Sequence, residues 1–348
     1  MPKRALIVSL QGIGNNLLAL PLAASLRLAG YERVEMLVTS PRAATLLTTH
    51  PAVDDTLASN AASFAGLKGR GRLVAELRRR RYDTAVLAYP SGEKSILLTA
   101  LADIPVRIGL AHWTLGAAQR LLTHSEPADH GLHDLEHNAA LARLAGASTD
   151  MNAHWPPFLP SHGAVNNARR FLRDNGFDPA ARYVGMHPGS DGHFIEKRWP
   201  EYHLARFAER MHRTRGLATI VFDGPSERGA GRRIANLAAT PVLPMDGWGD
   251  LADALGLLAF CDLFVSNDSG LMNLAAASGV PTVAVFGPSV VSRTRPWGPC
   301  RTAVVAERPC VPCYDLGPYS GCVHPTRMCL ADLSPDRVAS AVDDVMGT

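Results

Sequence analysis

Four stretches of the sequence place glycine, hydroxyl, amide or charged side chains directly after an apolar run. They are residues 12–16, 187–198, 223–227 and 267–270. Ligands of parallel sheets bind at the carboxyl ends of the strands, so residues that directly follow a strand are the first candidates for a site. Glycines let a backbone approach a ligand closely, and the amides at the start of a helix attract anions. The combination favours an anionic ligand such as a diphosphate.

The turn around residue 268 carries the most complete arrangement. In FVSNDSGLMNLAAASGVPTVAVFGPS, residues 264–289, a strand ends at Ser266 and a helix of small residues follows the turn. The amides of Ser269 and Gly270 would point toward a bound phosphate or sugar. Helix capping alone would explain Asp268 and Ser269 taken singly, but it does not explain the whole arrangement.

The stretch MHPGSDGHFIEKRWPEYH, residues 186–203, presents a hydroxyl and two cations after a strand. Ser190, Lys197 and Arg198 precede a proline that starts the next helix. Such groups on a loop at the end of a strand suit a diphosphate. A solvated surface loop is the alternative, but Trp199 beside the basic pair favours an anchored loop.

The stretch FDGPSERGAGRRI, residues 222–234, contains an acid with two interpretations. Ser226 is predicted to cap a helix, and Glu227 then lies in the first turn, where the macrodipole favours a carboxylate. The alternative is that Glu227 accepts hydrogen bonds from the hydroxyls of a ribose.

The opening turn QGIGNN, residues 11–16, has two glycines, Gly12 and Gly14, before a helix. The third glycine of the dinucleotide fingerprint is missing, and the strand VEMLVTS ends without the acid that would hold a ribose. A nicotinamide-dependent oxidoreductase is therefore disfavoured. A turn that needs glycine only for its backbone geometry is as consistent with this motif as a ligand contact.

The elements that must position these residues alternate between strand-like and helix-like, which is typical of parallel α/β architecture. In the first half the pattern predicts strands at 5–10, 34–38 and 84–88, and helices at 17–28, 41–48, 67–80, 95–102 and 133–144. In the second half it predicts strands at 183–186, 218–222, 263–266 and 282–286, and helices at 166–175, 201–214, 226–238, 250–260 and 270–278. Residues 147–165 lose this periodicity and contain several prolines. We therefore expect two doubly wound Rossmann-like domains, residues 1–160 and 161–348, that face each other across a cleft.

Composition excludes several function classes. The 348 residues are 47% hydrophobic and 19% charged, which is enough apolar material for two cores. A net charge of +3 disfavours nucleic acid as a partner. No apolar run approaches the roughly 18 residues of a membrane span, and the N-terminus reads as a first strand rather than a signal peptide. The expected location is the cytoplasm.

Four of the six cysteines are clustered, at Cys310, Cys313, Cys322 and Cys329. In a reducing compartment such a cluster, within the cysteine-rich segment 300–330, favours a metal over disulfides. Four thiolates suit tetrahedral zinc or iron in a structural role, and His324 could replace one of them. Free or disulfide-bonded cysteines are the alternative.

The helix LKGRGRLVAELRRRR, residues 67–81, is strongly basic. A solvated helix face is the usual explanation. The alternative is a face toward the anionic phosphates of a lipid-linked acceptor or toward the inner membrane surface.

Several of these motifs resemble one family. The NDSGLM segment resembles the signature of glycosyltransferase family 9, the bacterial heptosyltransferases of lipopolysaccharide core assembly. KRWPEYHLA, residues 197–205, is similar to a second signature, particularly that of the heptosyltransferase II branch, and ALIVSLQGIGNN and HPAVDDTL fit as well. The resemblance implies a GT-B-type fold, a nucleotide-sugar donor in the C-terminal domain and an acceptor in the N-terminal one. It also implies inversion of the anomeric centre by direct displacement, with no cofactor for the chemistry.

The resemblance also implies roles for individual residues. On the donor side, Lys197 would neutralise the diphosphate, Glu227 would hold the ribose and Met245 would lie near the base. The remaining donor-binding candidates are Ser190, Arg198, Asp268, Ser269, Gly270 and Asn273. Gly12 and Gly14 would lie on the acceptor side.

Two positions depart from the family pattern. Asn15 stands where the family usually has the aspartate thought to act as general base, and Asn273 stands where it usually has histidine. An amide cannot accept a proton at neutral pH, so Asn15 can orient an acceptor but cannot deprotonate it. Another carboxylate could serve instead, with Glu93 as first candidate and Asp191 as second. Otherwise the acceptor needs little help from a base, or the protein binds without transferring.

The predicted function is an inverting transfer of a heptose or related sugar from a nucleotide sugar, with ADP-heptose as first choice. The predicted acceptor is a hydroxyl of a glycan or lipid-linked glycan of lipopolysaccharide type, with peripheral contact to the inner membrane. The alternative is a catalytically silent sugar-nucleotide-binding protein of the same fold.

Overall fold

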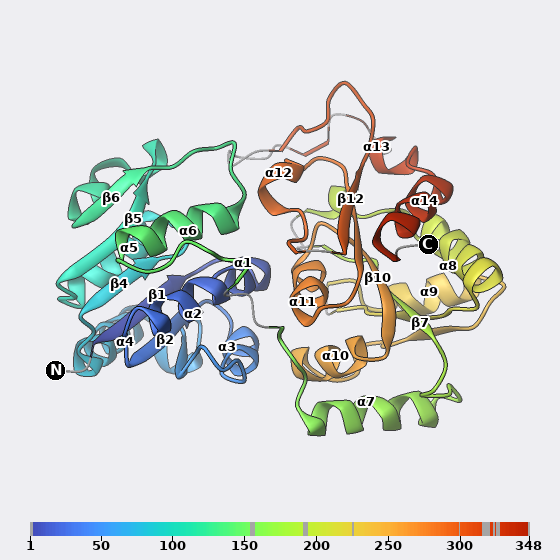
Figure 1. The fold of residues 1–348 in the computed structure, drawn as a ribbon, viewed down its shortest axis with the longest axis horizontal. Helices are drawn as coiled ribbons and strands as arrows, with labels where there is room; N and C mark the ends of the chain where they lie inside the picture. The colour runs from blue at the N-terminus through green and yellow to red at the C-terminus, as the bar shows by residue number, and fades with distance from the viewer. Residues whose placement is uncertain are drawn as a thin grey trace. The chain divides into compact units, whose positions relative to one another are not determined.

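The computed structural model describes residues 3–153, 157–190, 194–224, 226–298, 300–314, 321–322, 324 and 328–346. The chain divides into two compact units, Met1–Pro156 and Pro157–Thr348, each built on a parallel six-stranded sheet (Figure 1). The sequence predicts this division four residues later, after residue 160.

Unit 1 has the strand order β3-β2-β1-β4-β5-β6. The strands are β1 (Arg4–Ser9), β2 (Arg33–Val38), β3 (Asp55–Ala58), β4 (Thr84–Leu87), β5 (Val106–Ala111) and β6 (His124–Pro127). The helices are α1 (Ile13–Leu18), α2 (Leu20–Leu28), α3 (Pro41–Leu47), η1 (Ala62–Phe64), α4 (Gly66–Arg80), α5 (Glu93–Leu101), η2 (Trp113–Leu121) and α6 (Asp134–Leu144). The chain builds outward from β1 to β3 and then restarts on the other side of β1, so the topological switch point lies between β1 and β4.

Unit 2 repeats the same order, β9-β8-β7-β10-β11-β12. Its strands are β7 (Tyr183–His187), β8 (Ala218–Val221), β9 (Val242–Pro244), β10 (Cys261–Asn267), β11 (Thr282–Phe286) and β12 (Arg301–Val305). Its helices are α7 (His162–Asp174), η3 (Ile195–Lys197), α8 (Glu201–Arg215), α9 (Ala230–Leu237), α10 (Leu251–Leu258), α11 (Gly270–Ser278), α12 (Val291–Thr294), α13 (Met328–Ala331) and α14 (Pro335–Met346). The switch point here lies between β7 and β10.

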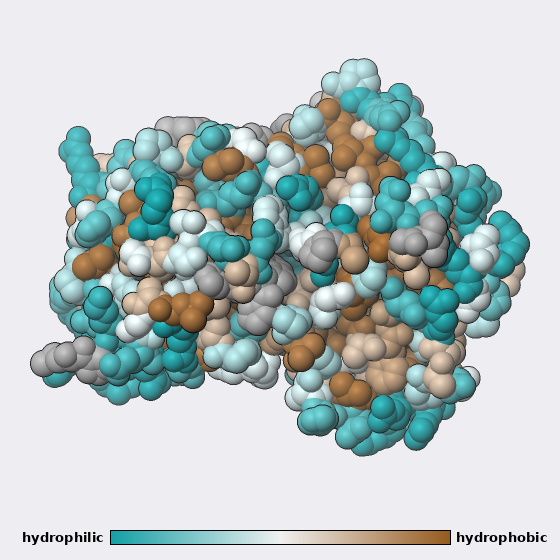
Figure 2. Space-filling model, viewed as in Figure 1, coloured by the Kyte–Doolittle hydropathy of each residue, from teal (hydrophilic) through white to brown (hydrophobic). Residues whose placement is uncertain are grey.

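The central strands are buried on both faces, as expected for apolar runs in a parallel sheet. Trp199 is buried in the core of unit 2, and its indole Nε1 donates a hydrogen bond to the carbonyl oxygen of Leu333 at 2.8 Å. The prediction that Trp199 anchors its loop is therefore confirmed. On the face drawn in Figure 2, small apolar patches are scattered among hydrophilic residues. Within the described residues, no helix is both long and apolar enough to span a bilayer.

Three expectations about elements need correction. The predicted helix 17–28 is two helices, α1 and α2, which meet at Ala19. The predicted helix 226–238 begins only at Ala230, so Ser226 does not cap it and Glu227 is not in its first turn. The strands β3, β5, β6, β9 and β12, outside the central pairs of both sheets, and the helix α14 were not predicted.

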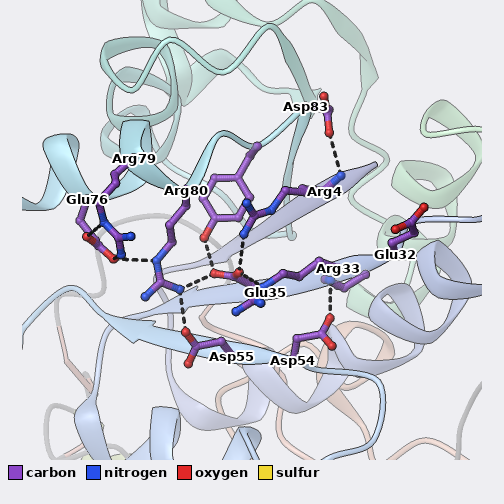
Figure 3. A network of polar contacts seen from close by, with 12 residues as sticks. Arg4, Glu32, Arg33, Glu35, Asp54, Asp55, Glu76, Arg79, Arg80 and Asp83 are labelled. Atoms are coloured by element: carbon purple, nitrogen blue, oxygen red, sulfur yellow. Dashed lines mark hydrogen bonds and ion pairs between the residues drawn. The ribbon is translucent and has the colours of Figure 1, made fainter. Parts of the chain in front are cut away.

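A network of charged side chains surrounds Glu35 near the amino-terminal ends of the strands of the unit 1 sheet (Figure 3). Glu35 on β2 is 1% exposed and accepts hydrogen bonds from Arg33, Arg80 and the hydroxyl of Tyr82, the last at 2.6 Å. Arg80 also donates to Asp55 at 2.7 Å. Burial by itself would raise the pKa of Glu35, but the hydrogen bonds from Tyr82, Arg80 and Arg33 lower it. The network ties β2, β3 and α4 together.

Candidate functional site

In unit 1, the loops that follow β1 and β4 meet at the switch point. Gly12 precedes α1 in extended backbone (φ −66°), and a Cβ at this position would meet no atom within 4 Å. The described chain therefore does not itself require glycine at position 12. Open space beside an exposed turn at this edge favours the ligand-contact interpretation. Gly14 lies one residue before Asn15 on α1 and is buried.

Asn15 is hydrogen-bonded to a carboxylate that the sequence does not indicate. Its Nδ2 donates to Oδ2 of Asp134 at 3.0 Å. Asp134 is the first residue of α6 and is 1% exposed. The two residues are 119 positions apart, and a lone acid at the start of a helix is ordinarily explained by capping. Only the topology shows that the two side chains meet.

Of the two carboxylates predicted as substitutes for a base, the structure describes Glu93. Glu93 opens α5 after β4 and is exposed, and its Oε1 lies beside Gly116, 3.1 Å from where a Cβ of that residue would stand. Asp191 lies outside the described residues. Among the side chains that the structure describes, Asp134 is the carboxylate hydrogen-bonded to Asn15.

In unit 2, Asn267 joins the two loops at the switch point. Its Oδ1 accepts a hydrogen bond from the amide of Trp199 at 2.9 Å. Its Nδ2 donates to the carbonyl oxygens of Pro188 at 2.9 Å and Gly189 at 3.0 Å. The side chain, 1% exposed, thus holds the end of β10 against the loop after β7. The sequence indicated a turn at Asn267 but not this link.

Lys197 and Asp268 come together on these loops. The Nζ atom of Lys197 lies 2.6 Å from Oδ2 of Asp268, and the hydroxyl of Thr294 donates to Oδ1 at 3.3 Å. Nζ also lies 5.1 Å from the ring centroids of both Phe194 and Tyr314, within cation–π range. The ammonium is therefore held on two sides, at the strand ends where a diphosphate is predicted.

At the start of α11, Ser269 caps the helix, and Asn273 has a side-chain oxygen without a hydrogen-bond partner among the described residues. Ser269 caps the helix, because its Oγ accepts a hydrogen bond from the amide of Met272 at 3.3 Å. Asn273, in the next turn, is 6% exposed, and its Oδ1 has no hydrogen-bond partner among the described residues. A buried oxygen without a partner costs about 1–3 kcal/mol. A ligand that donates a hydrogen bond here would remove that cost.

Glu227 and Arg198 line a pocket of about 370 Å³, together with residues such as Trp199 and Ala230. Glu227 is buried; its Oε2 accepts a hydrogen bond from the amide of Gly224 at 2.9 Å, and its Oε1 lies 3.5 Å from Nη2 of Arg198. Because α9 starts after Glu227, the helix dipole no longer accounts for this acid. The pocket volume lies in the range of small-molecule sites.

Ser190, Arg198 and Met245 are further donor-side candidates. Ser190 accepts a hydrogen bond from Nε of Arg198 at 3.2 Å, so these two predicted residues are brought together. Met245 follows β9, is mostly buried, and its amide donates to the carbonyl oxygen of Val221 at 2.9 Å. His187, which the sequence did not single out, ends β7 with a buried ring.

The cysteine segment packs on the loop after β11. The amides of Cys313 and Tyr314 both donate to the carbonyl oxygen of Pro288, at 2.9 and 2.8 Å. The four cysteines of the cluster are free thiols. Burial raises the pKa of Cys313 and of Cys329, and the neighbouring thiols raise both further. No group of three or more His, Cys, Asp or Glu side chains is arranged to hold a metal within the described residues, so the metal stays a prediction.

The family model described as glycosyltransferase family 9 (heptosyltransferase) matches residues 70–324 of this chain. The chain belongs to glycosyltransferase family 9. The matched range includes Asp134, Lys197, Glu227 and Asp268, whereas Asn15 lies before it.

Individual relatives agree with this assignment. The lipopolysaccharide heptosyltransferase 2 of Salmonella typhimurium is 32% identical over 237 residues, which are 65% of this chain and 66% of that protein. The structure of E. coli ADP-heptose lps heptosyltransferase II has a TM-score of 0.74 at 24% identity and covers 99% of this chain and 98% of its own. A family 9 structure from Veillonella parvula has a TM-score of 0.83 at 19% identity, with 99% and 97% covered. Both structures share the fold, and the prediction of two Rossmann-like units of GT-B type is confirmed.

Proposed function

We propose that this family 9 member transfers a heptose from ADP-heptose to a hydroxyl group of a lipopolysaccharide-type acceptor, with inversion at the anomeric carbon. The observation that carries the proposal is the pairing of Lys197 with Asp268 at 2.6 Å, at the switch point of unit 2 and inside the segment that matches the family. Support for the sugar and the acceptor comes from the relative named lipopolysaccharide heptosyltransferase 2.

The donor would bind at the strand ends of unit 2. Lys197 would exchange the carboxylate of Asp268 for the diphosphate, and Asn273 would gain a hydrogen-bond donor from the sugar. Glu227, on the wall of the 370 Å³ pocket, would accept hydrogen bonds from the ribose, and Met245 would lie near the base. Ser190, Arg198, Ser269 and Gly270 remain donor-binding candidates beside them.

In the transfer, the acceptor oxygen bonds to the anomeric carbon while the bond from that carbon to the diphosphate breaks. Negative charge accumulates on the leaving diphosphate. The ammonium of Lys197 would stabilise that charge, and such preorganised electrostatic stabilisation is often the largest contribution to catalysis. The chemistry needs no cofactor in this scheme.

Donor binding and turnover test the proposal separately. Titration calorimetry is expected to show that ADP-heptose binds, and that Lys197→Met weakens binding at least about tenfold because the diphosphate loses its cation. Release of ADP in the presence of a heptose-deficient lipopolysaccharide acceptor is expected for the wild-type protein only. Binding without release would favour the catalytically silent alternative, and no binding of ADP-heptose would refute the proposal.

We also propose that Cys310, Cys313, Cys322 and Cys329 hold a structural zinc or iron ion. Support comes from the donor set, four thiols within twenty residues. Elemental analysis of untagged protein is expected to give about one metal ion per chain, and a metal-free protein that binds the donor normally would contradict this.

A cytoplasmic location with peripheral contact to the inner membrane belongs to the same proposal. On α4, Arg79 and Arg80 are paired with carboxylates, whereas Leu67 is 85% exposed and lies beside the exposed Lys68 and Arg70. This end of α4 would contact anionic lipid around a lipid-linked acceptor. Sedimentation with phosphatidylglycerol vesicles, but not with phosphatidylcholine vesicles, is expected, and the charge reversals at Lys68 and Arg70 should abolish it.

A further inference from the structure

We propose that Asp134 supplies the carboxylate needed to deprotonate the acceptor hydroxyl, and that Asp134 and its hydrogen-bonded partner Asn15 act as one proton-accepting pair. The proposal deepens the glycosyltransferase function proposed above and depends on it. The transfer must remove a proton from the acceptor hydroxyl, and the amide of Asn15 by itself is not basic enough to keep it. The pair supplies a carboxylate within hydrogen-bonding distance of that amide.

The hydrogen bond fixes how Asn15 is presented. A carboxylate oxygen can only accept, so the atom 3.0 Å from Oδ2 of Asp134 is the donating Nδ2 of Asn15. The Oδ1 of Asn15 is therefore turned away from Asp134. It is the atom that would accept a hydrogen bond from a substrate hydroxyl, while the carboxylate of Asp134 contacts the other end of the amide, at Nδ2.

Asp134 is held rigidly in this position by the start of α6. His133 caps the helix: its ring Nδ1 accepts from the amide of Leu135 at 3.1 Å, and the carboxylate of Glu136 accepts from the amide of His133 at 2.7 Å. One turn further along α6, the ring of His137 stacks on the ring of Tyr89, which lies two residues after the end of β4. The ring centroids are 3.8 Å apart. The helix N-terminus and the amide of Asn15 both stabilise a negative charge here.

The acceptor oxygen forms a bond to the anomeric carbon, and its proton passes to Oδ1 of Asn15 while Nδ2 of Asn15 gives one of its protons to Oδ2 of Asp134. The bond between the anomeric carbon and the diphosphate breaks, and its electron pair leaves with the diphosphate. Asp134 then returns its proton to Nδ2 of Asn15, and Oδ1 of Asn15 releases its proton to solvent.

Exchanging the two residues tests the pair. Asp134→Asn keeps an oxygen that can accept the hydrogen bond from Asn15 but removes the charge, so kcat is expected to fall by about 100-fold or more. Asn15→Asp alone places two carboxylates about 3 Å apart, which must share a proton, so the pH optimum of kcat is expected to rise. The double exchange Asn15→Asp with Asp134→Asn restores one carboxylate and one amide. Its kcat is expected to exceed that of Asp134→Asn by at least about tenfold.

Two controls separate failure of this inference from failure of the proposed function. Binding of ADP-heptose, measured by calorimetry, should be the same in all four proteins, because the donor residues lie in unit 2; absence of binding or transfer in the wild type would refute the function itself. Asp103→Asn makes the same chemical change at an exposed residue of unit 1 and should leave kcat unchanged.

Two results would overturn the inference. One is a kcat for Asp134→Asn within about twofold of the wild type, as a purely structural hydrogen bond predicts. The other is a double exchange no more active than Asp134→Asn. If Asp134→Asn does not fold, the pH profile of Asn15→Asp decides, because an unshifted optimum would mean that the two carboxylates do not share a proton.

Discussion

His187 shows how a single side chain at the unit 2 site couples to pH. Its Nδ1 donates a 2.6 Å hydrogen bond to the carbonyl oxygen of Phe222. Burial lowers the pKa of His187 from 6.5, and the carboxylate of Glu227 opposes this only in part. Below about pH 6.5 the unfolded chain therefore binds a proton that the folded chain does not. The contribution to stability is complete above that pH and is lost as the pH falls below it.

We expect the melting temperature of the wild-type protein to fall between about pH 7.5 and about pH 5.5 more steeply than that of His187→Asn. The asparagine amide can still donate to Phe222 but takes up no proton. Thermal melts in matched buffers measure the difference. His162→Asn, at an exposed histidine, should follow the wild type, and parallel slopes for wild type and His187→Asn would contradict the prediction.

Asn273 gives a second prediction for one residue. Because its buried Oδ1 has no partner among the described residues, Asn273→Ala should leave the unliganded melting temperature unchanged or raise it. The same change should weaken ADP-heptose binding by about tenfold, since the ligand loses a hydrogen-bond acceptor. Calorimetry and thermal melts on one preparation measure both. Ser278→Ala, at the other end of α11, is the control, and an unchanged affinity in Asn273→Ala would remove Asn273 from the donor site.

The residues that the sequence indicated are those with a chemical type and a position after a strand. Lys197, Asp268 and Glu227 were predicted in this way. Asp134 and Asn267 were not, because each acts on a partner far along the chain. Asp134 meets Asn15 across 119 positions, and Asn267 meets Gly189 across 78. No local pattern contains such a contact.

Among the elements, the cysteine segment has a direct link to the phosphate-binding candidate. Tyr314 follows Cys313, forms a parallel bridge with Ser289, and lies with its ring 4.9 Å from that of Phe194. The two rings flank the ammonium of Lys197. The cysteine segment therefore contacts Lys197 through the ring of Tyr314.

Tyr314→Leu is expected to weaken ADP-heptose binding by about three- to tenfold, because a cation–π contact of this kind contributes roughly 1 kcal/mol. Tyr314→Phe, which keeps the ring, should bind like the wild type. Calorimetry measures both affinities. Equal weakening in the two variants would assign the effect to the hydroxyl group rather than to the ring, and no weakening in Tyr314→Leu would contradict the link.

Periodicity predicted most elements, although β5 (Val106–Ala111) and α14 (Pro335–Met346) were missed despite their lengths of six and twelve residues. The central strands β1, β4, β7, β10 and β11 and most helices were found within a few residues. Short strands such as β9 (Val242–Pro244) were missed, because three residues carry no measurable alternation. The start of α9 was misplaced because Ser226 and Glu227 fit a capping pattern, although Gly229 with a positive φ precedes the helix.

At the scale of the whole molecule, each unit has its own sheet and its own buried core. The stability of unit 1 additionally depends on Glu35, which forms ion pairs with Arg33 and Arg80 near the amino-terminal ends of the strands (Figure 3). Glu35→Gln is expected to lower the free energy of unfolding of unit 1 by about 2 kcal/mol, because the amide cannot replace the charge-assisted hydrogen bonds that the buried carboxylate accepts from Arg33 and Arg80. Urea unfolding followed by circular dichroism measures this.

The contribution of Glu35 to the free energy of unfolding depends on pH. The pKa of Glu35 is lower in the folded chain than its ordinary 4.5, so its contribution is present above about pH 4.5 and is lost as the pH falls below that value. The difference between wild type and Glu35→Gln should therefore shrink on acidification. Glu126→Gln, in a surface pair with Arg143, should cost less than about 1 kcal/mol at any pH. A difference that does not depend on pH would contradict the assigned role of Glu35.

The hydrogen bonds of Asn267 also constrain how unit 2 folds. They connect β10 to backbone carbonyls 78 and 79 positions earlier, so the loop after β7 acquires this support only after β10 has paired with β7. Contacts of such long sequence separation form late, since the loop-closure entropy must first be overcome. During synthesis, the ribosome must release at least residue 267 before this part of the unit can close. Recovery of nucleotide binding during refolding should therefore lag behind recovery of helical signal, and the ligand would report completion of the sheet.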